Sequence, residues 1–294
     1  MIVPDHAMRN IPTSMLDKAA QALGEPPSFL AGIGRCGHAA ATPTNFCHIH
    51  IHLLGQFQIF LGGRRLALGR KKPKRPLDLL KILIASGGLR ADTARLSESL
   101  WPDSDGDAAR NCFDITLHRL RQILSIPGLL SLSEGKLSFD ATNCWIDVWA
   151  FENVVQRIEA LTMSSTHCDL QDHDPLLADL LRLYAGHFLE HENQEVWAAA
   201  FRDKLKAKFG RSVINLAVCL ERQRKWDQAA VLYSRALELD NLAEPLYRRL
   251  MICYRELGET AEALKTYRRC QELLSIVLCV RPSAETEAIR ESCR

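Results

Sequence analysis

A run of basic side chains between residues 64 and 75 could bind a polyanion. The run contains no acidic residue and comprises Arg64, Arg65, Arg70, Lys71, Lys72, Lys74 and Arg75. Ammonium and guanidinium groups at this density bind the phosphates of a nucleic acid, although a solvated loop could have the same composition. We take the last five as candidate phosphate contacts, and the segments that follow decide between the two interpretations.

The segment from Asp107 to Leu124 is predicted to be a helix with two different faces. At about 100° per residue, one narrow stripe is apolar and must pack on the protein. This stripe contains Phe113, Leu117, Leu120 and Leu124. The opposite face carries Asn111, Ile115, His118, Arg119 and Gln122, and it is bordered by Asp114 and Arg121. Amide and guanidinium groups pair with purine edges, and an exposed isoleucine can touch a thymine methyl group. The face predicts a helix that reads double-stranded DNA, although an amphipathic surface helix with a stray isoleucine would look the same.

Cysteine and histidine residues upstream of this helix could in principle hold a metal. Six of them lie within 17 residues, namely Cys36, His38, Cys47, His48, His50 and His52. They could ligate zinc or copper. Their spacing fits no standard zinc motif, however, and the last three histidines would share one face of a strand. We therefore predict no metal and no cofactor.

No arrangement of residues indicates an enzyme. The sequence contains no Ser/His/Asp set, no glycine-rich phosphate loop and no recognisable catalytic pair of carboxylates. Its ten cysteines form no C-x-x-C pair and are expected to be small buried residues in a reducing cytoplasm.

Short strands and helices surround the predicted DNA-reading helix. Alternation with a period of two predicts a small antiparallel sheet between Cys47 and Leu68. Three helices should follow, one beginning at Pro76, one capped by Asp92 and the third as described. A hairpin with Glu134 and Gly135 at its tip closes the series, over Leu129–Leu132 and Lys136–Asp140. This order of elements predicts a winged helix.

The second half of the chain is predicted to be helical, with a helical region from Trp145 and helices around Leu176–Leu189 and Glu195–Phe209. An internal repeat follows these helices. The segment WDQAAVLYSRALEL from Trp226 aligns with TAEALKTYRRCQEL from Thr260, 34 positions later. The alignment pairs Ala229 with Ala263, Tyr233 with Tyr267, Ala236 with Cys270, Leu216 with Leu250 and Cys219 with Cys253. A period of 34 with small and aromatic residues on the helix faces is typical of tetratricopeptide repeats, which bind other proteins.

Length and composition fit a protein of two domains. The chain has 294 residues, 47% of them hydrophobic, which is enough for real cores. No apolar run approaches the roughly 20 residues of a membrane span, and no signal peptide is recognisable, so we predict a cytoplasmic protein. We expect a flexible extension over 1–47, a winged helix-turn-helix domain over 48–144, and an α-helical repeat domain over 145–294. The fold class is therefore mainly α with a small β component.

Several motifs in order resemble one known family, the antibiotic-regulatory-protein type of transcriptional activator. These proteins join an OmpR-type winged helix to a bacterial transcriptional activator domain. The matching stretches include LLGQFQIFLGGRRLALGRKKPKRPLDLLKILI, LWPDSDGDAARNCFDITLHRLRQIL, WIDVWAFE, YAGHFLE and RPSAET, and together they span about residues 49–290.

This resemblance implies specific roles for several residues. It implies a monomer or a homodimer that binds repeated promoter sequences and recruits RNA polymerase. It also implies that Asp114, Ile115, Thr116, His118, Arg119 and Arg121 occupy recognition-helix positions, with Lys136 at the wing. Arg224 stands where the repeat usually has glycine. The chain shows no receiver domain that would be phosphorylated and no Walker-type loop.

We therefore predict a DNA-binding transcriptional regulator, with RNA polymerase or another protein as partner of the repeats. The alternative is a protein-interaction adaptor that uses its repeats without specific DNA binding. The basic run and the exposed face of the third helix argue against the adaptor.

Overall fold

The computed structural model describes residues 49–68, 73–140, 142, 144–164, 173–192 and 196–293. Every described residue belongs to one compact unit, Cys47–Arg294. The predicted flexible extension over 1–47 lies outside the described residues. The same holds for three candidate phosphate contacts, Arg70, Lys71 and Lys72, and for the upstream part of the cysteine and histidine group, including His48.

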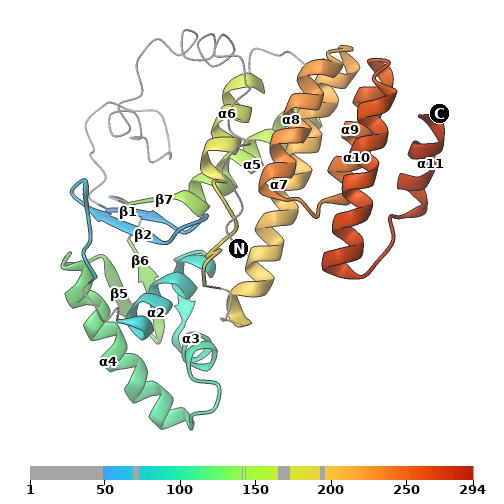
Figure 1. The fold of residues 1–294 in the computed structure, drawn as a ribbon. Coiled ribbons are helices and arrows are strands. Elements are labelled where there is room, and N and C mark those ends of the chain that lie inside the picture. Colours follow the sequence, from blue (N-terminus) through green and yellow to red (C-terminus); the bar gives the residue numbers. More distant parts are fainter. Residues whose placement is uncertain are drawn as a thin grey trace. The chain divides into compact units, whose positions relative to one another are not determined.

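The first sheet has four strands in the order β3-β2-β1-β7 (Figure 1). They are β1 (Ile49–His52), β2 (Gln58–Leu61), β3 (Arg64–Arg65) and β7 (Cys144–Ile146). The predicted alternation is confirmed, because Ile49 and Ile51 are fully buried while the intervening histidines face the other side. Strand β7 pairs in parallel with β1. The helix that the sequence placed from Trp145 therefore begins only at Asp147, because the preceding residues are strand.

A winged helix follows this sheet, as predicted. Its elements are α2 (Lys74–Ala85), β4 (Ala91–Asp92), α3 (Thr93–Leu100), α4 (Gly106–Leu124), β5 (Leu130–Ser133) and β6 (Lys136–Phe139). The three strands form a second sheet in the order β4-β6-β5. Asp92 caps α3, because its carboxylate accepts hydrogen bonds from the amides of Ala94 and Arg95 at 2.8 and 3.4 Å. The predicted apolar stripe of α4 is at most 2% exposed.

The rest of the described chain is helical. It comprises α5 (Asp147–Ser164), α6 (His173–Leu183), α7 (Val196–Arg222), α8 (Trp226–Leu239), α9 (Glu244–Glu256), α10 (Thr260–Leu273), a π-helical segment η2 (Leu274–Leu278) and α11 (Ala284–Ser292). Helix α7 is one continuous helix of 27 residues, whereas the sequence suggested an end at Phe209. A mainly α fold with a small β component is confirmed.

The 34-residue repeat is also a repeat of packing. Helix α7 packs on α8, α8 on α9, and α9 on α10. Equivalent positions of α8 and α10 are buried alike, since Ala229, Ala236, Ala263 and Cys270 are all fully buried. Small residues at these positions allow the helices of each pair to approach closely, and Tyr233 and Tyr267 fill the adjacent space.

The winged-helix and helical regions are joined through the end of β1. The amide of Gly55 donates to the carbonyl of His187 at 2.9 Å, and the amide of Leu189 donates to the carbonyl of Leu53 at 2.8 Å. The buried carboxylate of Asp147 accepts from the amides of Leu53 and Leu54 at 2.7 and 2.8 Å. Asp147 belongs to the stretch WIDVWAFE, and His187 and Leu189 belong to YAGHFLE, so both stretches hold the junction.

Candidate nucleic-acid interface

The exposed face of α4 lies opposite the stripe that packs on α2 and α3. Asn111, Asp114, Ile115, His118, Arg119 and Gln122 are all exposed. Ile115 is 55% exposed in the middle of a helix, as its place opposite the stripe predicts. It therefore contributes little to packing within this chain, whereas its neighbours offer hydrogen-bond donors and acceptors of the kind that read base edges.

The polar side chains of this face differ in how firmly they are held. The Nε2 atoms of Gln122 and His118, one turn apart, lie 3.1 Å from each other and can share a hydrogen bond. Arg119 makes no hydrogen bond or ion pair with any residue that the structure describes, so its guanidinium keeps all its donors for a ligand.

Arg121 connects α4 to the hairpin. Its Nη2 atom donates to the carbonyl oxygen of Leu130 on β5 at 3.0 Å. This hydrogen bond fixes the position of the hairpin relative to the helix. The sequence predicted for Arg121 only a contact with DNA, and the structure adds a contact that positions the hairpin.

Two residues that the family resemblance assigned to the interface are less accessible. Thr116 is 6% exposed, because its position lies beside the apolar stripe, so its side chain faces the core and not the exposed face of α4. Lys136 is half-buried at the start of β6, where it pairs with Asp92 of β4 and Ser133 of β5. It lies next to the tip of the hairpin, which supports the predicted place at the wing.

Basic residues flank α4 at the surface. Lys74 and Arg75 are exposed in the first turn of α2, and Arg64 and Arg65 are exposed on β3. Arg110 is also exposed on α4, three helical turns before Arg121, although it does not belong to the narrow face opposite the stripe. A count of all basic positions on the helical wheel would have found it.

The first turn of α4 has the opposite charge. Asp103, Asp105 and Asp107 precede or begin the helix, and all three are exposed. Carboxylates at a helix N-terminus are favoured by the helix dipole, but they repel phosphates. A nucleic acid should therefore contact α4 along its middle and its C-terminal half.

The histidines of β1 face an aromatic surface and show no metal site. The rings of His50 and His52 lie 5.8 and 5.1 Å from that of Trp145. Burial and the nearby His50 lower the pKa of His52 below its ordinary value. Within the described ranges, no three histidine, cysteine or acidic side chains gather as metal ligands would.

No described helix has the length and apolar character that crossing a membrane requires.

Comparisons with known proteins place the chain in a family. Residues 146–294 match the family described as "Bacterial transcriptional activator domain". Among solved structures, the chain is similar to Mycobacterium tuberculosis EmbR in complex with a low-affinity phosphopeptide, with a TM-score of 0.61 and 18% sequence identity. The similarity covers 84% of this chain and 65% of that one, and at this identity it shows a shared fold alone. The search of curated proteins gave no match. The chain therefore belongs to the bacterial transcriptional activator domain family, whose members are regulators of transcription and not enzymes.

Proposed function

We propose that this protein binds double-stranded promoter DNA through its winged helix and contacts RNA polymerase or another protein through its helical repeats. The proposal places the DNA-binding domain at 48–144 and the partner-binding domain at 145–294, in a cytoplasmic protein. The observation that carries the DNA half is the exposed face of α4, where Ile115 stands among hydrogen-bonding side chains and is 55% exposed.

In this proposal α4 lies in the major groove. Asn111, Arg119 and Gln122 can pair with the edges of purines, and Ile115 can contact the methyl group of thymine. Because thymine presents that methyl group only in some sequences, the isoleucine contributes to the choice of sequence more than to the affinity for DNA in general. His118 and Asp114 complete the surface that meets the base edges.

Phosphate contacts surround this face. Lys74, Arg75 and the wing residue Lys136 are proposed to hold the DNA backbone, together with Arg70, Lys71 and Lys72, which lie outside the described residues. Such contacts fix the register of α4 in the groove but carry no sequence information themselves. Arg121 can add a phosphate contact with those guanidinium donors that the carbonyl of Leu130 does not use.

The repeats offer a surface for a protein partner. After α10, four large aliphatic side chains, Ile276, Val277, Leu278 and Val280, are between 48% and 77% exposed. Four exposed large aliphatic side chains within five residues favour a contact with another protein over permanent exposure to solvent. We propose that RNA polymerase or another protein of the transcription machinery covers it while the winged helix is bound to a promoter.

A paired titration tests the DNA half of the proposal. The variant Ile115→Ala is titrated against a promoter fragment, selected by the wild-type protein from random DNA, and against a scrambled fragment at the same salt concentration. The affinity for the selected fragment should fall by about 1–3 kcal/mol, and the affinity for the scrambled fragment should stay nearly unchanged. Stability should also stay nearly unchanged, because the side chain is exposed.

The matched control is Val231→Ala on α8, where the valine is 61% exposed. It removes a comparable aliphatic surface far along the chain from α4 and should leave both affinities alone. If Ile115→Ala keeps the ratio of the two affinities, the residue takes no part in reading sequence. If the wild-type protein binds neither fragment, the adaptor alternative replaces this proposal.

A further inference from the structure

Two consecutive arginines form the edge strand of the first sheet. Arg64 and Arg65 make up β3, and both are exposed. Neither one forms a hydrogen bond or an ion pair with another side chain in the part of the chain that the structure describes. Each guanidinium is therefore a charge without a counter-ion within the described residues, and the function proposed above assigns a role to neither.

The register of the sheet places the two arginines on opposite faces. Arg64 pairs with Leu61, and Arg65 pairs with Phe60. Successive side chains of a strand alternate between faces, and paired residues share one face. Arg65 therefore lies on the side of Phe60, whose ring is 5.6 Å from that of His52. Arg64 lies on the side of Leu61.

The face of Leu61 adjoins the C-terminal end of α4. Leu61, Gly62 and Ile49 line a cavity of about 260 Å³ together with Ile126, Pro127 and Leu129, which follow the last residue of α4. Cys144 and the carboxylate of Asp140 complete the lining, so an anion beside this cavity needs a cation to offset Asp140. The turn between β2 and β3 thus lies beside the point where the chain leaves the predicted DNA-reading helix. Arg64 extends from this turn, whereas Arg65 points to the face of the histidines.

Electrostatics favour a phosphate at this end of α4 only where cations are present, and Arg121 in the last turn of the helix is one of them. The three exposed aspartates disfavour phosphates at the N-terminal end of the helix. The C-terminal end carries the partial negative charge of the helix dipole, so it also repels an anion by itself. A guanidinium beside this end makes the local electrostatic potential positive. It also offers paired hydrogen-bond donors whose geometry matches a phosphate.

We propose that Arg64 binds a phosphate of the DNA backbone next to the bases that α4 reads, and that Arg65 does not. This inference rests on the proposed DNA binding. It adds the β2–β3 turn of the first sheet to the DNA interface, at a site separate from the basic residues of α2 and from the wing.

The test compares Arg64→Ala with Arg65→Ala, which have the same net charge and lie in the same two-residue strand. Binding of the full chain to its selected promoter fragment is measured by fluorescence anisotropy at several salt concentrations. For Arg64→Ala the slope of log affinity against log salt should become shallower by about 0.9, the value for one lost phosphate contact. The slope for Arg65→Ala should equal that of the wild type.

Phosphate ethylation interference then locates the contact. One backbone position outside the bases read by α4 should interfere with wild-type binding and lose its effect in Arg64→Ala. Equal slopes for the two arginine variants, or an unchanged interference pattern, would overturn the inference while leaving the proposed function intact. A wild-type protein that binds no DNA would overturn both.

Discussion

At the scale of single residues, Arg224 shows what the repeat requires of its backbone. Arg224 ends the turn after α7 with a φ of 59°, and Gly258, 34 positions later, ends the turn after α9 with a φ of 77°. The two turns have the same hydrogen bonds, from the amide of Lys225 to Leu220 at 2.9 Å and from that of Glu259 to Tyr254 at 2.8 Å. An arginine has thus been forced into the left-handed conformation that glycine adopts without strain.

We expect Arg224→Gly to stabilise the protein. The replacement removes the steric strain of the left-handed conformation, about 1–2 kcal/mol, and loses part of that gain because glycine is freer in the unfolded chain. The net increase in the free energy of unfolding should be about 0.5–1 kcal/mol, measured by urea denaturation. Gly258→Ala is the reverse control. A Cβ at this position meets no atom within 4 Å, so its strain is purely conformational and should lower stability by a similar amount.

If Arg224→Gly instead lowers stability, then the arginine side chain contributes more than its backbone costs. No described contact of Arg224 suggests such a contribution, and its side chain is exposed.

The sequence correctly predicted whether a side chain is buried or exposed where the periodicity of a single helix determines it. Ile115 is exposed because it lies opposite the stripe of α4, and the spacing of that stripe is visible in the sequence. Thr116 was assigned to the interface only by family resemblance, and the structure buries it, because one residue along a helix turns the side chain by about 100°. The contact of Arg121 with Leu130 could not be predicted, because it depends on where the hairpin folds back.

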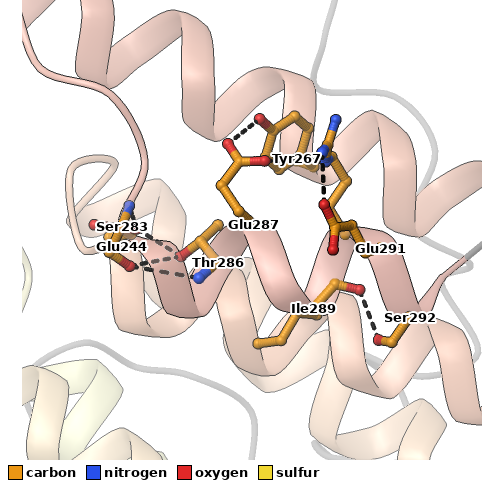
Figure 2. A network of polar contacts seen from close by, with 9 residues as sticks. Glu244, Tyr267, Ser283, Thr286, Glu287, Ile289, Glu291 and Ser292 are labelled. Atoms are coloured by element: carbon orange, nitrogen blue, oxygen red, sulfur yellow. Dashed lines mark hydrogen bonds and ion pairs between the residues drawn. The ribbon is translucent and has the colours of Figure 1, made fainter.

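At the scale of elements, α11 is attached mainly by polar contacts. Of its own residues only Thr286 is buried. Figure 2 shows the network that holds it: Glu244 of α9 accepts from the amide of Ser283 at 2.7 Å and from the hydroxyl of Thr286 at 2.5 Å. Tyr267 of α10 donates to Glu287 at 2.5 Å. The stretch RPSAET therefore caps and anchors the last helix.

Removal of the central acceptor should release α11. We expect Glu244→Ala to leave the buried hydroxyl of Thr286 and the amide of Ser283 without this partner, which costs about 1–3 kcal/mol. Amide hydrogen exchange in residues 284–292 should accelerate accordingly, while exchange in α8 stays slow. Burial raises the pKa of Glu244, but bonds from Thr286 and Ser283 outweigh it, so the pKa lies below its ordinary value and the anchor should weaken as the pH falls through that lowered value.

The matched control for this anchor is Glu285→Ala. Glu285 forms an ion pair with Arg248 at 3.1 Å, but its side chain is 76% exposed, so its loss should change exchange very little. Equal acceleration in both variants would mean that general charge, and not the buried acceptor, holds α11.

The sequence predicted most helices and strands, but it missed those that form through contacts with residues distant in the sequence. Strand β7 has three residues and pairs Cys144 with Ile49, so no local pattern identifies it. Helix α7 continues through Gly210, where the sequence suggested a break, because α5, α6 and α8 pack along it and compensate for a poor helix former. Strand ends and helix lengths follow tertiary contacts, whereas the repeat and the winged-helix order follow local periods.

At the scale of the whole described chain, the two regions share one hydrophobic core. Buried side chains form a continuous cluster from Ile49 of β1 to Leu274 after α10. Gly186 allows the backbones to meet, because a Cβ at this position would lie 3.0 Å from the Cα of Gly55. Trp149 of α5 adds a bond from its indole Nε1 to the carbonyl of Ile84 on α2 at 3.3 Å. The two predicted regions therefore pack around one shared core, which periodicity within each half could not reveal.

One buried lysine of α2 makes an ion pair within its own helix and another across this junction. The side chain of Lys81 on α2 is 4% exposed and lies 3.5 Å from the carboxylate of Asp78, which is 1% exposed. Its ammonium also binds Glu192, beyond α6, and sits 4.5 Å from the centre of the Phe57 ring. The ammonium of Lys81 is thus a positive charge almost fully removed from water, and it contacts residues of both regions.

We expect Lys81→Met to destabilise the winged-helix and the helical regions together. Methionine fills a similar volume but leaves the carboxylate of Asp78 buried without its ammonium, and loss of one partner of a buried pair costs about 3–5 kcal/mol. Unfolding by urea should remain a single transition at a lower midpoint. Hydrogen exchange should accelerate both in α2 and in residues 186–192, because the contact belongs to both.

The double variant Lys81→Met with Asp78→Asn should recover part of the lost stability, since Asp78 is then no longer a buried charge. Lys265→Met is the control, because its ion pair with Glu262 has side chains 76% and 48% exposed and should contribute little. If Lys81→Met instead unfolds in two separate transitions, with α2 lost first and α7 unaffected, the two regions are independently stable and the shared core does not couple them.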